Sequence, residues 1–352
     1  MSIFNKIIKI KRADRFDNRR IDQIRCDRNE KVSDWNQNIL NKIYKTISNR
    51  EFTSYFDQKK ISSISFKVAN YLGVSKENFC YFHGGDSVIR DFILFNYKQN
   101  LSASINDLNY QMYEVYAKSL KIKLIKTKYL FNKKNLNLFN LDKTNFLKVI
   151  PKVDIIFFTN PNQISNFDFN IKEFEKIIIK WKKKIFFIDE SYFGFGHKSF
   201  INLVKNHKNI YILRSVTKSL GMAPHRIGFL VSHKENIKKF KVMQTPYPLS
   251  LYSGKILEYF LDNFKLIKSY NKNVQLGRDF FSKNLRKKGY ILNNSFGNSV
   301  NIFFKNKKEM QKKYDLLKEK KIITKPTNYY KNFYLRVTCD NIGLMKKILQ
   351  NF

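Results

Sequence analysis

Residues 214–228 read Arg214-Ser-Val-Thr-Lys-Ser-Leu-Gly-Met-Ala-Pro-His-Arg-Ile-Gly228. This stretch follows one short apolar run, Tyr211–Leu213, and leads into another, Ile227–Val231. Lys218 therefore lies at the end of a predicted strand, in a loop rich in hydroxyl groups and eight positions before Arg226. Such a loop suits a cofactor that is both an aldehyde and a phosphate, because the amine can form a Schiff base while hydroxyls and guanidinium bind the phosphate.

One lysine is weak evidence in a chain that holds 67 Lys and Arg residues and has a net charge of +39. The excess is mostly lysine, scattered with Asn, Ile and Phe along the whole length. We interpret it as the compositional drift of an AT-rich genome, and we expect no specific nucleic-acid partner. A field of this sign still steers anionic substrates toward the protein.

The composition is typical of a globular protein with a substantial core, since 43% of the 352 residues are hydrophobic. Cys26, Cys80 and Cys339 are odd in number and far apart, and the five histidines have no metal-ligand spacing. We therefore expect neither a disulfide framework nor a metal site. No apolar run approaches membrane-spanning length and the start of the chain is too rich in lysine for a signal peptide, so a cytoplasmic protein without a membrane partner is predicted.

Short apolar runs alternate with segments of helical period from about residue 60 to residue 245. The predicted strands are Phe79–Phe82, Ile122–Lys126, Asp154–Phe158, Ile185–Ile188, Tyr211–Leu213 and Ile227–Val231. Amphipathic segments such as Ile171–Trp181 lie between them. Apolar runs of four to seven residues joined by helices predict a mostly parallel sheet that is buried on both faces, which is an α/β architecture.

The pattern changes after Pro246-Tyr-Pro-Leu-Ser250. The elements predicted beyond it are a long helix at about 251–287, a strand at Ser299–Phe304, a lysine-rich helix at 307–320, a strand at Phe333–Thr338 and a final helix. We expect three parts: an N-terminal segment at 1–45 that joins the small domain, a large cofactor-binding domain at 46–250 and a small α+β domain at 251–352.

Polar clusters follow four of the predicted strands. They are Gly84-Gly85-Asp86, Asn160-Pro-Asn-Gln163, Asp189-Glu190 and Ser215–Lys218. In α/β sheets, ligands bind beyond the carboxyl ends of the strands. We therefore expect the four clusters to line one shared site.

In order and spacing, these clusters resemble the pyridoxal-phosphate-dependent aminotransferases of class I/II, which have fold type I, and in particular the histidinol-phosphate aminotransferase branch. The resemblance runs from about Asp27 to the C-terminus. Its main pieces are Asp189-Glu-Ser-Tyr192, the Lys218 loop, Tyr110-Gln-Met-Tyr-Glu-Val-Tyr-Ala117, Pro246–Ser250 and Leu335-Arg-Val-Thr338. It implies pyridoxal 5'-phosphate as the cofactor, a mostly parallel mixed sheet between helices with a smaller α+β domain, and a homodimer.

Three catalytic residues are implied by the resemblance. Lys218 would hold the cofactor as a Schiff base and later move the proton, a role that needs a lysine that is neutral near the working pH. Asp189 would pair with the protonated pyridine nitrogen, although an aspartate after a strand is also a common helix N-cap. Tyr192 would hydrogen-bond the phenolic oxygen of the cofactor, and core packing is its plain alternative.

The same resemblance implies a binding site for the cofactor phosphate. Arg226 and Thr217 would bind it together with Ser215. The backbone N–H groups of Gly85 and Asp86 would help at a helix start, where the helix dipole favours an anion. The glycine pair is alternatively an ordinary turn, and it is not a P-loop because the Gly-Lys-Ser/Thr ending is absent.

Four further residues are implied at the ring and the substrate. Tyr110 would stack on the cofactor ring, with a half-buried helix position as the alternative. Arg336 would grip the substrate carboxylate, or another anionic group, as a bidentate fork. Asn29 matches an N-terminal motif on the substrate side. Tyr55 would reach the phosphate of the neighbouring subunit, and loop packing is its alternative.

The segment Asn160-Pro-Asn-Gln-Ile-Ser-Asn166 departs from the family pattern Asn-Pro-x-Asn-Pro-Thr-Gly. Gln163 stands where an asparagine usually bonds the phenolic oxygen, and it offers the same amide on a longer arm. Because the proline, threonine and glycine are missing, a looser turn is expected. The groups that Schiff-base chemistry needs are all retained.

The leading interpretation is a ping-pong aminotransferase that takes the amino group of an anionic, for example phosphorylated, donor and gives it to a 2-oxo acid. An alternative keeps the cofactor but removes carbon dioxide, as threonine-phosphate decarboxylases do, because the reaction depends on which bond stands perpendicular to the ring. A more distant alternative is a non-catalytic basic protein that binds polyanions with a steep dependence on salt.

Overall fold

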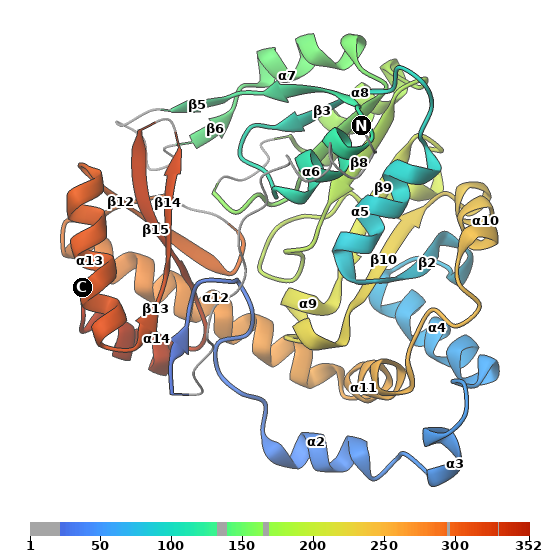
Figure 1. The fold of residues 1–352 in the computed structure, drawn as a ribbon, viewed down its shortest axis with the longest axis horizontal. Coiled ribbons are helices and arrows are strands. Elements are labelled where there is room, and N and C mark those ends of the chain that lie inside the picture. The colour runs from blue at the N-terminus through green and yellow to red at the C-terminus, as the bar shows by residue number, and fades with distance from the viewer. Residues whose placement is uncertain (1–21, 132–138, 165–168, 294–295, 330) are drawn as a thin grey trace, which may run out of the picture.

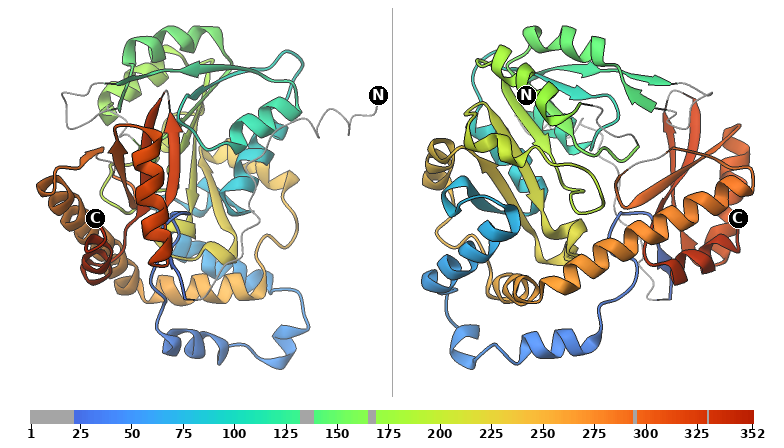
Figure 2. Two further views of the ribbon diagram at one scale, coloured as in Figure 1. Left: turned by 60° about the vertical axis from the view of Figure 1, so that its left-hand side comes forward. Right: turned by 180° about the vertical axis from the view of Figure 1, so that it is seen from behind.

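The computed structural model describes residues 22–131, 139–164, 169–293, 296–329 and 331–352. Within these residues, a seven-stranded sheet lies between two layers of helices, and a four-stranded sheet lies beside it (Figures 1 and 2). The long helix α12 (Phe264–Lys287) runs from the first unit to the second. The first 21 residues of the expected N-terminal segment lie outside the described part.

The larger sheet has the strand order β2-β10-β9-β8-β7-β3-β4. Its strands are β2 (Phe79–His83), β3 (Ser102–Asn106), β4 (Lys123–Thr127), β7 (Ile155–Thr159), β8 (Ile185–Asp189), β9 (Ile210–Ser215) and β10 (Ile227–Ser232). Pairing is parallel from β4 to β9, whereas β10 runs antiparallel to both of its neighbours. The predicted α/β class with a mostly parallel mixed sheet is confirmed.

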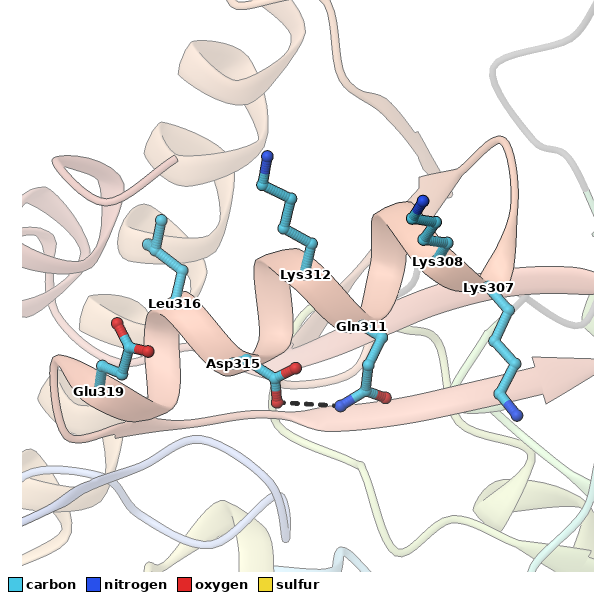
Figure 3. A pocket seen from close by; sticks show the side chains of 7 residues that line it. All are labelled: Lys307, Lys308, Gln311, Lys312, Asp315, Leu316 and Glu319. Atoms are coloured by element: carbon cyan, nitrogen blue, oxygen red, sulfur yellow. Dashed lines mark hydrogen bonds between the residues drawn. The ribbon is translucent and has the colours of Figure 1, made fainter.

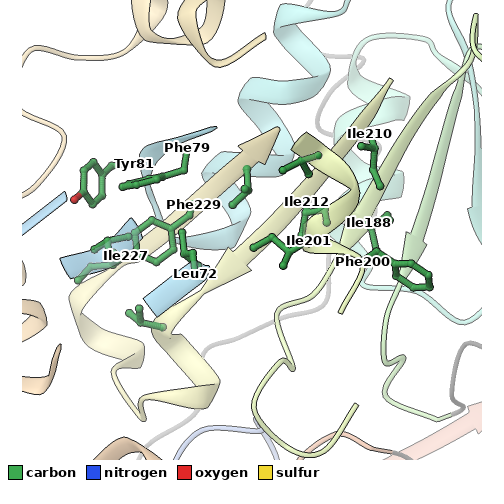
Figure 4. Close-up of a cluster of buried hydrophobic side chains, with 14 of the residues drawn as sticks. Leu72, Phe79, Tyr81, Ile188, Phe200, Ile201, Ile210, Ile212, Ile227 and Phe229 are labelled. Atoms are coloured by element: carbon green, nitrogen blue, oxygen red, sulfur yellow. The ribbon is translucent and has the colours of Figure 1, made fainter. Parts of the chain in front are cut away.

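Alternating side chains of each central strand enter two separate cores. In β8, Phe186 and Ile188 face the core that also contains residues of α4 and α11, while Phe187 faces the core with residues of α5 and α6. Figure 4 shows part of the first core, including Ile188, Ile212 and Phe229. This arrangement explains the uninterrupted apolar runs, because a strand buried on both faces has no solvent side.

Helices cover both faces of this sheet. They are α4 (Gln58–Leu72), α5 (Gly84–Phe95), α6 (Met112–Ser119), α7 (Lys143–Val149), α8 (Ile171–Lys180), α10 (Lys234–Met243) and α11 (Leu251–Asp262). The short elements around them are α2 (Gln37–Tyr44), α3 (Asn49–Phe52), α9 (Val216–Ser219), β5 (Tyr129–Phe131) and β6 (Phe139–Leu141).

The smaller unit is an antiparallel sheet with the order β11-β12-β15-β14 and helices against it. Its elements are β11 (Ile291–Asn293), β12 (Ser299–Phe304), α13 (Lys307–Glu319), β13 (Ile322–Ile323), β14 (Lys325–Tyr329), β15 (Asn332–Thr338) and α14 (Ile342–Leu349). The N-terminal strand β1 (Ile24–Arg25) pairs with β13, and Cys26 is buried in the core of this unit.

A core of the large sheet contains residues on both sides of positions 45 and 251, where the boundaries between the three parts were expected. Ile43 in α2 and Leu257 in α11 both belong to a core of the large sheet. The helical stretch expected at about 251–287 is present and consists of two helices, α11 and α12, with Asn263 between them. The change from the large to the small unit therefore falls inside α12.

Strand β3 was missed from the sequence because it reads Ser-Ala-Ser-Ile-Asn, without an apolar run. Its polar residues Ser104 and Asn106 are nevertheless buried, since the strand lies between β7 and β4 in the sheet. Position in the sheet, and not the polarity of the segment, decided its conformation.

Contacts of Asp340 connect helix α12 and the N-terminal segment to the small unit. A Cβ atom on Gly277 of α12 would lie 1.7 Å from the carbonyl oxygen of Asp340, so only glycine fits there. The Asp340 carboxylate accepts hydrogen bonds from the backbone N–H groups of Val32 and Ser33, at 3.1 and 2.9 Å. The segment that contains Asn29 is thereby tied to the small unit.

Candidate active site

Side chains from both units and from the N-terminal segment meet beyond the carboxyl ends of β7, β8 and β9. Lys218 Nζ donates a hydrogen bond to the carbonyl oxygen of Arg28 at 3.0 Å. The Asn29 amide donates to the Tyr192 hydroxyl at 2.7 Å, and Arg336 of β15 donates to Gln163. Segments separated by up to about three hundred positions in the sequence are therefore neighbours at one edge of the sheet.

Lys218 lies on α9, a single helical turn that directly follows β9. The Ser215 side chain caps this turn by accepting from the Thr217 N–H at 3.2 Å. The pKa of Lys218 is lowered to about 8, mainly by burial and also by Arg336 and Arg226, while Glu30 acts in the opposite direction. The amine is thus available as a nucleophile at a much lower pH than a lysine in water.

Asp189 ends β8 and is buried, with both carboxylate oxygens hydrogen-bonded. One oxygen accepts from the Ser191 N–H at 2.9 Å, and the other accepts from the Tyr113 hydroxyl at 3.0 Å. Burial raises the pKa of Asp189, while the hydrogen bonds from Ser191 and Tyr113 lower it. These contacts hold the carboxylate in one orientation at the edge of the sheet.

Tyr192 and Asn29 form a buried chain of hydrogen bonds with Thr338. The Thr338 hydroxyl donates to the Asn29 carboxamide oxygen at 3.1 Å, and the Asn29 amide donates to the Tyr192 hydroxyl. Burial raises the pKa of the Tyr192 phenol, and Arg336 and Asn29 lower it. Asn29 adopts a left-handed conformation, with φ of 56°, that asparagine tolerates better than most residues.

The start of α5 and Arg226 form a positively polarised corner. Helix α5 begins at Gly84 and has no side-chain cap, so its first N–H groups remain for another acceptor. Gly84 has a φ of 79°, which favours glycine, and a Cβ atom there would lie 2.5 Å from Arg226 Nη2. Asp86 Oδ2 lies 3.5 Å from the same guanidinium, and it is the carboxylate that faces Arg226.

The hydroxyls of Ser215 and Thr217 lie at the end of β9, and they bond to each other at 2.8 Å. Gly85 follows Gly84 in α5, and a Cβ atom there would meet only ordinary contacts with Leu213 and Ser191. The structure therefore places every residue of the predicted phosphate site at the carboxyl ends of β2 and β9 or in the turn before β10.

Within the described ranges, the hydrogen-bond partners of Arg336 are neutral. Its Nη1 donates to the Gln163 side-chain oxygen, and its Nη2 donates to the backbone oxygen of Asp27 at 2.9 Å. Among the described residues, none of the Asp and Glu side chains forms a salt bridge with Arg336. A cation that is held by neutral groups favours an anionic ligand.

Tyr110 and Tyr55 differ in their surroundings. Tyr110 precedes α6 and is half-buried against the core beneath α5 and α6. Tyr55 is 78% exposed and stacks on Tyr247 with ring centroids 4.3 Å apart. Within this single chain, Tyr55 is therefore a surface residue and not part of the cluster around Lys218.

Glu190 and Arg214 form a buried ion pair next to Asp189, with a separation of 2.8 Å. The Glu190 carboxylate also accepts from Ser199 and from the Phe200 N–H, at 2.7 and 2.8 Å. The negative charge of Glu190 is neutralised by Arg214, and its oxygens accept hydrogen bonds from the loop after β8, which they stabilise. Asp189 is therefore the carboxylate that faces the site.

Sequence reasoning missed four residues of this region: Tyr113, Thr338, Asn293 and Asn301. Tyr113 and Thr338 lie inside segments that were singled out, three residues after Tyr110 and two after Arg336. Spacing on one helix or strand face could have indicated both. The sequence contains no comparable signal for Asn293 and Asn301. Their role depends on which residues of the large unit lie opposite them, and spacing along the chain does not show this.

A shallow depression elsewhere is lined by residues of one helix face on α13, with a hydrogen bond between Gln311 and Asp315 (Figure 3). It contains none of the predicted site residues. The described residues include no group of three or more His, Cys, Asp or Glu side chains able to hold a metal ion. None of the helices in the described part is long and apolar enough to cross a membrane.

Comparison with known proteins agrees with this geometry. The model of the family "aminotransferase class I and II" matches residues 22–350. The histidinol-phosphate aminotransferase of Thermotoga neapolitana is 26% identical over 322 residues, which covers 89% of each chain. A dihydroxyacetone phosphate transaminase of Campylobacter jejuni is 29% identical over 170 residues, covering 47% of this chain and 46% of its own. The structure of a histidinol-phosphate aminotransferase from Sinorhizobium meliloti, in complex with pyridoxal-5'-phosphate, has a TM-score of 0.80 at 15% identity and covers 93% of this chain and 89% of that one.

The chain belongs to the class I and II aminotransferases, and it is a transaminase that depends on pyridoxal phosphate. The resemblance predicted from the sequence is thereby confirmed, as is the cofactor.

Replacing Tyr113 by phenylalanine should destabilise the protein, because Asp189 loses a buried donor while the packing of the ring on Phe157 is kept. A hydrogen bond to a charged group contributes about 1.5–3 kcal/mol, and we expect a loss of that size in the free energy of unfolding at neutral pH. The variant raises the pKa of Asp189 further, because the lost hydrogen bond favours the ionised carboxylate. The loss of free energy of unfolding should therefore become smaller as the pH falls through that pKa and Asp189 is protonated. Urea denaturation over a range of pH measures it, with Tyr97→Phe at an exposed site as the control. An equal loss at every pH would contradict the assigned contact.

Proposed function

We propose that this transaminase takes the amino group of an anionic donor, with phosphorylated donors included, and passes it to a 2-oxo acid by way of Lys218. The main support is the environment of the Lys218 amine, which is buried, has a pKa of about 8 and lies near Arg336 and Arg226. Both relatives described above are named for phosphorylated substrates. A net charge of +39 favours an anionic donor as well.

The residues present fit pyridoxal phosphate. The uncapped start of α5, the guanidinium of Arg226 and the hydroxyls of Ser215 and Thr217 would hold its phosphate. Asp189 would face the pyridine nitrogen and Tyr192 the phenolic oxygen, with Tyr110 on the ring. When bound, the cofactor supplies an aldehyde for the amine and an electron-withdrawing ring that stabilises negative charge at the substrate Cα.

The protein groups then have separate tasks. Lys218 would hold the cofactor through its amine and, once released by the donor, would accept the proton from Cα and return it, for which a pKa near the working pH is favourable. Asp189, fixed by Ser191 and Tyr113, keeps a negative charge at the inner edge of the site. Arg336 orients the donor through its anionic group, and Asn29 holds the Tyr192 hydroxyl.

The test of this function is the visible absorption spectrum of the purified protein with added pyridoxal phosphate. We expect a cofactor band in the wild type that is absent in Lys218→Ala, because the covalent link needs the amine. Lys234→Ala, at an exposed position on α10, should keep the band. An amino donor should bleach the wild-type band and yield a 2-oxo acid.

Two results would contradict the proposal. A band that survives in Lys218→Ala would remove Lys218 from its role. Release of carbon dioxide in place of a 2-oxo acid would show a decarboxylase of the threonine-phosphate type on the same scaffold.

The capture of cofactor should depend on pH through Lys218. Since its pKa is lowered to about 8, the ammonium form predominates below pH 8 and cannot attack an aldehyde. We expect the rate of appearance of the visible band to rise with pH and to be half-maximal near pH 8. Glu30→Gln removes a charge that raises this pKa, so its profile should shift to lower pH, while Glu319→Gln on α13 should not shift. A flat profile between about pH 7 and pH 9 would contradict the assignment.

We also propose a homodimer in which Tyr55 reaches the cofactor phosphate of the partner subunit. Tyr55 stacks on Tyr247 and Tyr44 packs edge-on against Tyr252; we take these four exposed rings, with the exposed Phe52, as the face that meets the partner. Exposed apolar patches of this kind are typical of protein–protein interfaces. The face is separate from the cluster around Lys218, so a partner subunit is needed for Tyr55 to contribute.

Light scattering should give the mass of a dimer, and the double variant Phe52→Glu with Tyr252→Glu should give the monomer, because two buried charges at an interface are costly. The monomer should bind pyridoxal phosphate at least about tenfold more weakly, the effect of losing one charge-assisted hydrogen bond. Leu276→Ala, at an exposed position on α12, serves as the control. A fully active monomer would overturn the dimer proposal.

A further inference from the structure

Three side chains of the small sheet form one row across neighbouring strands. In the register of the sheet, Asn293 of β11 is opposite Asn301 of β12, and Asn301 is opposite Arg336 of β15. Side chains of residues that are directly opposite lie on the same face of a sheet. The two asparagines and the substrate-side arginine therefore point toward the large unit together.

All three residues bind the same two residues of the large unit. The Asn301 amide donates to the backbone oxygen of Gln163 at 2.9 Å, and the Asn293 amide donates to the backbone oxygen of Ile164. Arg336 Nη1 donates to the side-chain oxygen of Gln163. We call Asn293 and Asn301 the amide clamp, since they hold two consecutive carbonyl groups.

The clamp acts on the segment that lacks the proline, threonine and glycine of the family pattern. The first half of this segment is bonded to the large unit, with Asn160 N–H donating to Asp189 O at 2.8 Å and the Asn162 amide donating to Leu108 O at 2.6 Å. The second half, at Gln163 and Ile164, is bonded to the small sheet. Amide groups thus supply the restraint that a rigid turn sequence would supply otherwise.

Among the described residues, the row of the two asparagines and Arg336 leaves buried polar atoms without a hydrogen-bond partner. Both asparagines are buried, and within the described residues their Oδ1 atoms have no hydrogen-bond partner. The Nε atom of Arg336, in the same row, is likewise buried and without a partner there. Buried polar atoms that stay unpaired cost stability, and this cost accompanies the hydrogen bonds that the two amides make to the backbone oxygens of Gln163 and Ile164.

We propose that Asn293 and Asn301 are positioning residues: by fixing the backbone of Gln163 and Ile164, they place the Gln163 carboxamide on Arg336 and so orient the guanidinium for an anionic ligand. The carboxamide oxygen and the Asp27 backbone oxygen hold Nη1 and Nη2, while Nε has no partner among the residues that the structure describes. The Gln163 side chain also interacts with the Tyr192 phenol, where it favours a lower pKa. The inference rests on the proposed role of Arg336 as the anion site.

The first measurement is amide hydrogen exchange in peptides that cover residues 155–164, made on the full chain without cofactor. In Asn293→Ala and Asn301→Ala we expect exchange in this segment to be about two- to tenfold faster, the effect of one lost hydrogen bond. Asn284→Ala is the matched control, because that amide also donates to a backbone oxygen in the small unit, at 2.8 Å, but does not contact the segment. Gln163→Asn should exchange as the wild type does, since the clamp binds backbone atoms.

The second measurement is the affinity of the same proteins for succinate by calorimetry. Succinate carries two carboxylates and neither an amine nor an oxo group, so it probes the anion site without reaction. We expect both clamp variants and Gln163→Asn to bind it about two- to tenfold more weakly, and Arg336→Ala to lose most of the binding. With cofactor and an amino donor, the clamp variants should raise KM with little change in kcat.

Each outcome decides for or against the proposal. Faster exchange with unchanged succinate affinity would make the clamp merely structural, and tighter binding in Gln163→Asn would show that Gln163 competes with the ligand; either result overturns it. Succinate binding that is independent of Arg336 would overturn the anion site and the positioning role together. Binding that depends on Arg336 and the clamp, in a protein that gives no visible cofactor band, would contradict the proposed function alone and support the clamp.

Discussion

The burial of the Lys218 amine is the constraint on which the site depends. A lysine removed from water loses the solvation of its charge, so its neutral form becomes accessible near pH 8. The amine is buried because the N-terminal segment around Arg28 covers the end of β9, with the Arg28 carbonyl oxygen 3.0 Å from Nζ. We call this segment the cover. Because Arg336 and Arg226 also act on the amine, both packing units take part in setting its chemistry.

The cover is itself held by the small unit. Asp340 binds the backbone of Val32 and Ser33, and Gly277 allows α12 to approach the Asp340 carbonyl closely. On the other side, the amide clamp and Arg336 bind the segment at Gln163 and Ile164. The small unit thus contacts the cover and the loop at the end of β7, so any change in its position alters both boundaries of the site.

Much of the large unit was predictable, because its central strands are buried on both faces and read as uninterrupted apolar runs, as in Ile185–Ile188. The clusters beyond those strands, including Asp189 and Lys218, could be placed at one edge for the same reason. Strand β3 was not predictable from its residues, since Ser104 and Asn106 are polar and acquire their burial from the neighbouring strands. The break between α11 and α12 at Asn263 was missed because the helical period continues across it.

The sequence by itself indicated the strands of the large sheet other than β3, the residue types beyond their ends and the match to the aminotransferase pattern. These are local properties, since periodicity and spacing do not depend on distant contacts. The tertiary structure alone decided that Tyr113 bonds Asp189, that Asn29 bonds Tyr192 and that two asparagines bond the carbonyls of Gln163 and Ile164. The partners in the last two cases are more than a hundred positions apart, and only the packing of the two units brings a donor to within hydrogen-bond distance of its acceptor.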